Sequence, residues 1–149
     1  MLLFSTSATT GVADLSELDV LHEASILHNL KVRYGKNDVY TFVGNILCVL
    51  NPFKPLSCYS SDIVSKYHKA GEEVVTLSPH IFATAQLSYS NMSKSKEDQV
   101  IIITGESGAG APTYLVQVPK EHNSNSSCIR VVEEGSSTLP TMCAKLRNT

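Results

Sequence analysis

The run Val100-Ile101-Ile102-Ile103-Thr104-Gly105-Glu106-Ser107-Gly108-Ala109-Gly110 decides which fold we expect for the chain. Its first half is apolar and β-branched, which is typical of a buried strand, and its second half is rich in glycine. Gly105, Gly108 and Gly110 permit positive φ angles and let backbone N–H groups approach an anion closely. The run therefore predicts a phosphate-binding loop at the end of a strand.

This loop departs from the full P-loop pattern at the two positions that carry the chemistry. In the pattern G-x-x-x-x-G-K-[ST], the Lys reaches the β- and γ-phosphates and the hydroxyl holds Mg²⁺. Here Gly110 is followed by Ala111 and Pro112. A glycine turn without the Lys fits an ordinary strand-to-loop turn as well as it fits a nucleotide site. Other segments of the chain are needed to distinguish these two interpretations.

Residues 98–110 closely resemble the P-loop strand of the myosin motor head, in which Gly-Glu-Ser-Gly-Ala-Gly is followed by Lys and Thr. The same resemblance is carried by residues 24–34, by the loop at residues 51–59, and by the Ser78-Pro79-His80-Ile81-Phe82-Ala83 segment. It suggests an N-terminal fragment of a motor head, truncated within the P-loop, with features of the class-nineteen heads.

The resemblance also suggests boundaries. We interpret residues 1–10 as a disordered N-terminus, residues 11–110 as part of a motor domain, and residues 111–149 as an unrelated, disordered tail. In the tail, Pro112 and Pro119 oppose a helix, and residues 121–127 are polar and of low complexity.

A second candidate binding element is Asn51-Pro52-Phe53-Lys54-Pro55-Leu56-Ser57-Cys58-Tyr59. Its prolines end the preceding strand and stiffen the loop. By itself the loop is either an ordinary proline-rich turn or a rigid wall for a flat, hydrogen-bonding purine. The resemblance implies the second reading, in which Phe53 packs and four residues contact the purine end of ATP: Asn51, Pro52, Lys54 and Tyr59. It also implies phosphate contacts from Gly105, Glu106, Ser107, Gly108, Ala109 and Gly110.

Periodicity predicts an α/β fold, and the resemblance implies a P-loop NTPase-type fragment with a twisted sheet surrounded by helices, followed by an irregular tail. Residues 39–43 and 46–50 read as a hairpin around Gly44-Asn45, and the second run reads as buried on both faces. We expect the strand at 100–104 to be central and flanked by the strand that ends at Leu50. The expected helices are 22–34, with Ile26, Leu27, Leu30 and Tyr34 on its apolar face, 61–70, and 79–92, with Ser78 as N-cap.

Composition limits the function classes. The chain has 149 residues and a net charge of −2, with no basic block suited to nucleic acid. Its four cysteines lack zinc-site spacing and read as reduced thiols. The N-terminus lacks a basic secretory region, and no apolar run is long enough for a membrane span, which together favour a cytoplasmic setting.

The resemblance implies an actin-activated ATPase that binds ATP with Mg²⁺ and moves along actin filaments of the cytoskeleton. This chain lacks the P-loop Lys and Thr, the later switch loops and the actin-binding regions, so we expect it to be inactive alone. We assign no catalytic residue and no metal ligand. The alternative is a non-enzymatic truncated product that acts at most as an interaction fragment.

Overall fold

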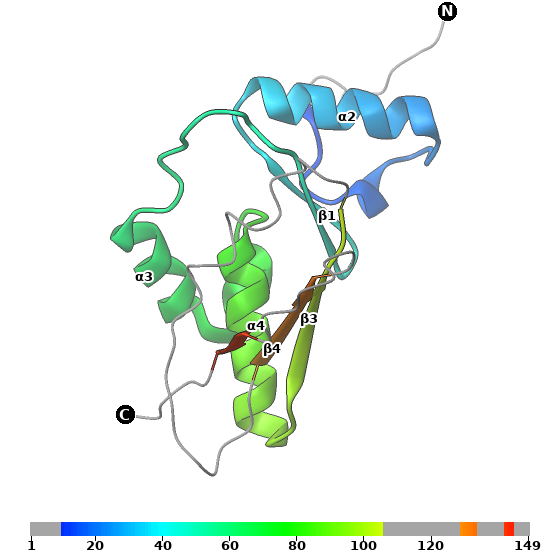
Figure 1. The fold of residues 1–149 in the computed structure, drawn as a ribbon. Helices are drawn as coiled ribbons and strands as arrows, with labels where there is room; N and C mark the ends of the chain where they lie inside the picture. Colours follow the sequence, from blue (N-terminus) through cyan, green and yellow to red (C-terminus); the bar gives the residue numbers. More distant parts are fainter. Residues whose placement is uncertain (1–9, 106–128, 134–141, 145–149) are drawn as a thin grey trace, which may run out of the picture.

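Groups of helices and groups of short strands follow one another along the chain, consistent with an α/β fold (Figure 1). The computed structural model describes residues 10–105, 129–133 and 142–144. All three expected helices are present within a few residues of their expected bounds. In chain order, with η for a 3₁₀ helix, the elements are η1 Leu15–Glu17, α2 Glu23–Gly35, β1 Tyr40–Val43, β2 Ile46–Val49, α3 Ser61–Ala70, η2 Gly71–Thr76, α4 Ile81–Ser95, β3 Gln99–Ile103, β4 Ile129–Glu133 and β5 Met142–Ala144.

The strands that the structure describes form two sheets rather than the single one expected. β1 and β2 make the predicted antiparallel hairpin, with Tyr40 opposite Val49 and Gly44 at a φ of 58° in the turn. β3 pairs in parallel with β4, which pairs antiparallel with β5. The expectation that β3 is central and flanked by the strand ending at Leu50 is therefore wrong for the described strands. A two-residue turn makes β1 the neighbour of β2, and β3 lies at the edge of the other sheet.

Both strands expected to be fully buried expose part of their length. Val100 and Ile102 of β3 are 54% and 64% exposed, and Ile46 of β2 is 68% exposed. Alternate residues of a strand point to opposite faces, and α4 packs against β3 and β4 from one side. β3 therefore buries one face only, which a continuous apolar run cannot reveal.

The expectation that residues 111–149 are irregular is wrong for two short segments. β4 and β5 lie inside residues 111–149 and are paired strands. The rest of that tail, and all but Thr10 of the expected disordered N-terminus, lie outside the described residues.

The apolar core of the described region lies where α3, η2 and α4 meet, and Figure 1 shows α3 beside α4. Four buried side chains form this apolar cluster: Tyr67, Val74, Phe82 and Ala83. Val74 has no exposed surface. Phe82 contributes to this cluster from the helix expected at 79–92, and its side chain is 7% exposed.

Helix α4 starts later than expected. The predicted N-cap at Ser78, with Pro79 in the first turn, is wrong. Instead the His80 ring accepts a hydrogen bond from the N–H of Phe82 at 3.1 Å and caps the helix.

Helix α2 buries polar side chains instead of the apolar face expected from periodicity. Leu27 is 68% exposed, whereas Asn29 and Arg33 are 3% and 8% exposed. The Asn29 amide accepts from the Val12 N–H at 2.7 Å and donates to the Val12 carbonyl at 3.1 Å. It thus pairs with the N-terminal segment as a neighbouring strand would.

Arg33 ties α2 to the hairpin. Its Nε donates to the Thr41 hydroxyl at 3.0 Å, and its Nη2 donates to the Tyr40 carbonyl at 2.8 Å. We call Asn29, Arg33 and Thr41 the polar junction. Gly11 packs against this junction with a φ of 73°. A Cβ at this position would lie only 2.9 Å from Cγ of Arg33, so the packing favours glycine.

Within the described ranges, no helix has both the length and the apolar character needed to cross a bilayer.

Candidate functional site

The loop that follows β2 contains the four predicted purine contacts. The last ladder bond of the hairpin runs from the Leu50 N–H to the Val39 carbonyl, and Pro52, which has no N–H, then ends the strand. Asn51 turns the chain, because its Oδ1 accepts a hydrogen bond from the Phe53 N–H at 2.9 Å. Pro52 is buried and anchors this turn.

Two loop side chains reach outward. Phe53 is 84% exposed and has a φ of 49°, so its expected packing role is wrong in this structure. The turn made by the Asn51 side chain places Phe53 in the left-handed region, away from the core. Lys54 follows it and is also exposed, which leaves its ammonium available to a ligand.

At the other end of the loop, Tyr59 is held in place by its neighbours. Its hydroxyl lies 2.9 Å from the hydroxyl of Tyr40. Its ring lies 5.7 Å from that of His80 and meets the ring of Phe82 edge-on at 6.3 Å. Burial and the hydrogen bond to Tyr40 raise the pKa of the Tyr59 hydroxyl, so the group stays protonated.

His80 lies at the centre of these rings and is 4% exposed. Its Nδ1 accepts from Phe82, and among the described residues its Nε2 has no hydrogen-bond partner. Burial lowers the pKa of His80 to about 4, with the Cys58 backbone acting weakly in the opposite direction. The imidazole is therefore neutral at pH 7, with its proton on Nε2.

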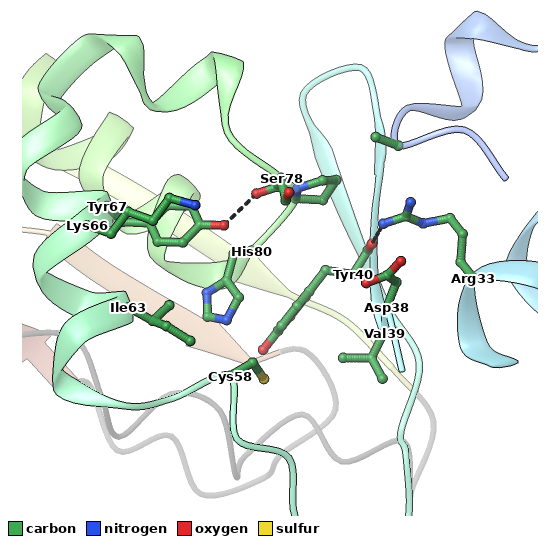
Figure 2. Close-up of a pocket in the computed structure, with 12 residues that line it drawn as sticks. Arg33, Asp38, Val39, Tyr40, Cys58, Ile63, Lys66, Tyr67, Ser78 and His80 are labelled. Carbon is green, nitrogen blue, oxygen red and sulfur yellow. Dashed lines mark hydrogen bonds between the residues drawn. The ribbon is translucent and has the colours of Figure 1, made fainter. Parts of the chain in front are cut away.

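A cavity of about 270 Å³ lies beside the loop. Figure 2 shows His80 between Tyr67 and Tyr40, with its ring extending toward Cys58. Arg33 and Lys66 bring positive charge to the wall, and Asp38 brings negative charge. The volume is just below the range of ~300–1,000 Å³ that is common for small-molecule sites.

Sequence reasoning missed Tyr40 and His80 as parts of this site. Both stand in segments whose pattern indicates only a strand start and a helix start. Apolar periodicity and the family resemblance both point to the segment that contains Ile81 and Phe82, but neither assigns a role to His80.

The glycine loop falls almost entirely outside the described residues. Thr104 and Gly105 are described and exposed, and residues 106–110 are not described. The predicted phosphate contacts from Glu106, Ser107, Gly108, Ala109 and Gly110 therefore stay a prediction, as does the spatial relation of this loop to Asn51 and Tyr59.

No metal centre is present in the described part of the chain, since no three His, Cys, Asp or Glu side chains come together there. The cysteines Cys48 and Cys58 are free thiols, as expected for these two.

The residues fit one end of ATP better than the other. The loop offers amide, ammonium and phenol groups around a rigid turn, which suits the flat, polar edge of adenine. For the Mg²⁺-bound phosphates, the chain carries Ala111 and Pro112 where the pattern needs a Lys and a hydroxyl.

Comparison with known proteins identifies the fold family. The family model of the myosin head (motor domain) matches residues 12–118, so the match continues beyond Gly110, where the resemblance was expected to end. Myosin-J heavy chain of Dictyostelium discoideum is 39% identical over 140 residues, and the match covers 87% of this chain and 6% of that protein. Myosin-VIIa of Drosophila melanogaster is 45% identical over 126 residues, which cover 78% of this chain and 6% of the relative. Human unconventional myosin-Vb is 43% identical over 101 residues, which cover 67% of this chain and 5% of that protein.

Proposed function

Because the chain belongs to the myosin head (motor domain) family, we propose that it supplies the adenine-binding part of the ATP site of an actin-based motor. The chain spans only 5% to 6% of the length of the curated relatives it matches. The ATPase activity, the binding of actin filaments and the cytoskeletal location are therefore proposed for a complete motor. The class-nineteen resemblance also stays a prediction.

The observation that carries the proposal is that both ends of the loop are fixed before any ligand binds. At one end Asn51 is held by the Phe53 N–H, and its carbonyl lies 3.4 Å from the Tyr34 hydroxyl. At the other end Tyr59 is held by Tyr40. A loop that is already ordered loses little conformational entropy when a base binds.

The phosphate end is expected to be weak. ATP with Mg²⁺ would supply the phosphoanhydride bond whose hydrolysis drives movement, whereas the residues of this chain would bind and orient the nucleotide. A charged hydrogen bond of the kind the missing Lys makes is worth roughly 1.5–3 kcal/mol, which is about one to two orders of magnitude in affinity. Phosphoryl transfer depends on positioning and charge stabilisation, so we propose that this chain has no turnover of its own.

The second candidate is a non-enzymatic interaction fragment that binds no nucleotide. The substitution of Ala111 and Pro112 for the Lys and the hydroxyl favours it. The two candidates differ in whether ATP stabilises the folded chain.

Thermal unfolding with and without excess Mg-ATP separates them. A site of dissociation constant Kd stabilises the fold by RT ln(1 + [L]/Kd), so the midpoint rises with ATP concentration. We expect a small rise for the native sequence, a larger one for Ala111→Lys with Pro112→Thr, and ATP hydrolysis in neither.

The matched control adds Asn51→Ala to the Ala111→Lys, Pro112→Thr variant. This third substitution removes one proposed purine contact and leaves the glycine loop intact. If ATP raises the unfolding midpoint of neither the native chain nor the Ala111→Lys, Pro112→Thr variant, the chain is better described as an interaction fragment. Hydrolysis above the level of a chain lacking Gly108 and Gly110 would contradict the proposed inactivity.

A further inference from the structure

Tyr40 is one of the most firmly held side chains near the loop, with 3% of its surface exposed. Its backbone pairs with Val49 across the hairpin, and its carbonyl accepts from Nη2 of Arg33 at 2.8 Å. Its ring lies 4.7 Å from that of His80. The Tyr40 hydroxyl is therefore a fixed point, set by the strand, by α2 and by the start of α4.

Tyr59, in contrast, lies on the loop and is only half-buried. Between it and β2 come residues such as Phe53 and Lys54 that are exposed. Its ring contacts with His80 and Phe82 limit where the ring can lie. Its hydroxyl meets that of Tyr40 at 2.9 Å, a distance typical of an O–H···O hydrogen bond.

We propose that Tyr40 is a positioning residue for the adenine end of the site. Through this hydrogen bond it holds the Tyr59 phenol in one orientation, so that the group facing the base is ordered before the base arrives. The inference rests on the proposed function, because it assigns to Tyr40 a part in the same purine contact. Tyr40 itself acts through Tyr59 and lies beneath the loop.

Adenosine is the probe that tests this idea, because it carries the base and no phosphate and so does not depend on the glycine loop. Its dissociation constant for the full chain can be measured by ligand-observed NMR titration, which reaches millimolar affinities. Tyr40→Phe removes one oxygen and leaves the ring packing in place. A neutral hydrogen bond is worth a factor of about two to ten in affinity, so we expect adenosine to bind Tyr40→Phe that much more weakly.

Tyr67→Phe is the matched control. The Tyr67 hydroxyl donates to the Ser78 carbonyl at 2.8 Å and belongs to the same group of packed rings. This variant loses a hydroxyl hydrogen bond of the same kind and leaves the hydrogen bond between Tyr40 and Tyr59 in place. We expect its stability to fall by an amount similar to that of Tyr40→Phe while its affinity for adenosine stays unchanged.

A double variant supplies a second measurement. If Tyr40 acts only through the Tyr59 hydroxyl, then adding Tyr40→Phe to Tyr59→Phe should not weaken adenosine binding further. Inorganic triphosphate, which lacks the base, should bind native and Tyr40→Phe chains equally.

The results separate the positioning role of Tyr40 from the proposed function on which it rests. Equal adenosine affinity of the native and Tyr40→Phe chains would overturn the positioning role and leave the proposed function standing. Equal weakening by Tyr67→Phe, or additive effects in the double variant, would also overturn it. No adenosine binding by the native chain would overturn the proposed function and the inference together.

Discussion

The apolar cluster and the polar junction are both buried, but different forces stabilise them. In the cluster, Val74 and Phe82 gain stability from burial and dispersion, which depend little on direction. In the junction, Asn29 and Arg33 each make two hydrogen bonds of defined geometry. The cluster therefore keeps α3 and α4 together, whereas the junction sets how α2, the hairpin and the N-terminal segment align. The frame that holds the loop at residues 51–59 is specified by hydrogen bonding more than by apolar packing.

The largest expected effect is on the apolar cluster. Phe82→Ala removes a side chain that is 7% exposed and leaves a cavity between α3 and α4. We expect it to lower the free energy of unfolding by about 3–5 kcal/mol, measured by urea denaturation. Val75→Ala, at a position 64% exposed, is the control and should change stability by less than ~0.5 kcal/mol. Similar losses from the two variants would mean that the cluster is not the core.

The next effect comes from His80, whose ring lies between Tyr40 of the hairpin and Phe82 of the cluster. Its pKa is lowered from 6.5 to about 4 by burial, so the unfolded chain takes up the proton more readily than the folded chain. The stability that the neutral ring contributes is fully present above pH 6.5 and is lost as the pH falls toward 4. This loss should amount to ~3 kcal/mol.

His80→Asn isolates this contribution, because Asn can keep the helix cap and does not titrate. The difference in unfolding free energy between native and variant chains should shrink as the pH falls between 6.5 and 4. A difference that is independent of pH would show that His80 titrates normally in the folded state.

The junction gives the third effect. Asn29→Ala removes both hydrogen bonds to Val12, and we expect a loss of ~2 kcal/mol in the free energy of unfolding. Hydrogen exchange should become faster at the Val12 amide, with little change in the amides of α4. Asn91→Ala, at an exposed site on α4, is the control. Faster exchange throughout α4 in Asn29→Ala would contradict the separation of the two regions.

The smallest expected effect is at the edge of the junction. Gly11→Ala places a Cβ 2.9 Å from Cγ of Arg33, at a φ of 73°. We expect it to lower the midpoint of thermal unfolding by a few degrees, equivalent to ~1 kcal/mol. Gly35→Ala meets no atom within 4 Å and serves as the control. A neutral Gly11→Ala would mean that the N-terminal segment does not pack as described.

The contrast between the regions also explains what the sequence could reveal. The helices and the hairpin follow from apolar periodicity and from turn residues such as Gly44, and these expectations are confirmed. Periodicity predicted the helix α2 correctly but not its buried face, because it counts apolar residues and the buried side chains there are Asn29 and Arg33. The pairing of β3 depends on contacts between distant segments, which no local pattern contains.

The candidate site was predictable only in part. The loop at residues 51–59 is continuous in sequence, so its composition and its resemblance to the family are enough to predict a binding role for it. The tyrosine that supports it is 19 positions away from Tyr59, on a strand whose pattern gives no sign of a role in binding. A contact of this kind becomes visible only when the chain has folded.

The parallel pairing of β3 with β4 has a consequence for the order of folding during synthesis. Gln99 pairs with Ile129, so the two strands can meet only after β4 itself has left the ribosome. The α3–α4 unit needs only local contacts and can form earlier. Until β4 arrives, β3 lacks the neighbour that pairs with its backbone in the folded sheet and presents an additional open edge. The nascent chain should therefore recruit chaperones most strongly in this interval, and ribosome profiling of chaperone-bound chains would reveal that window.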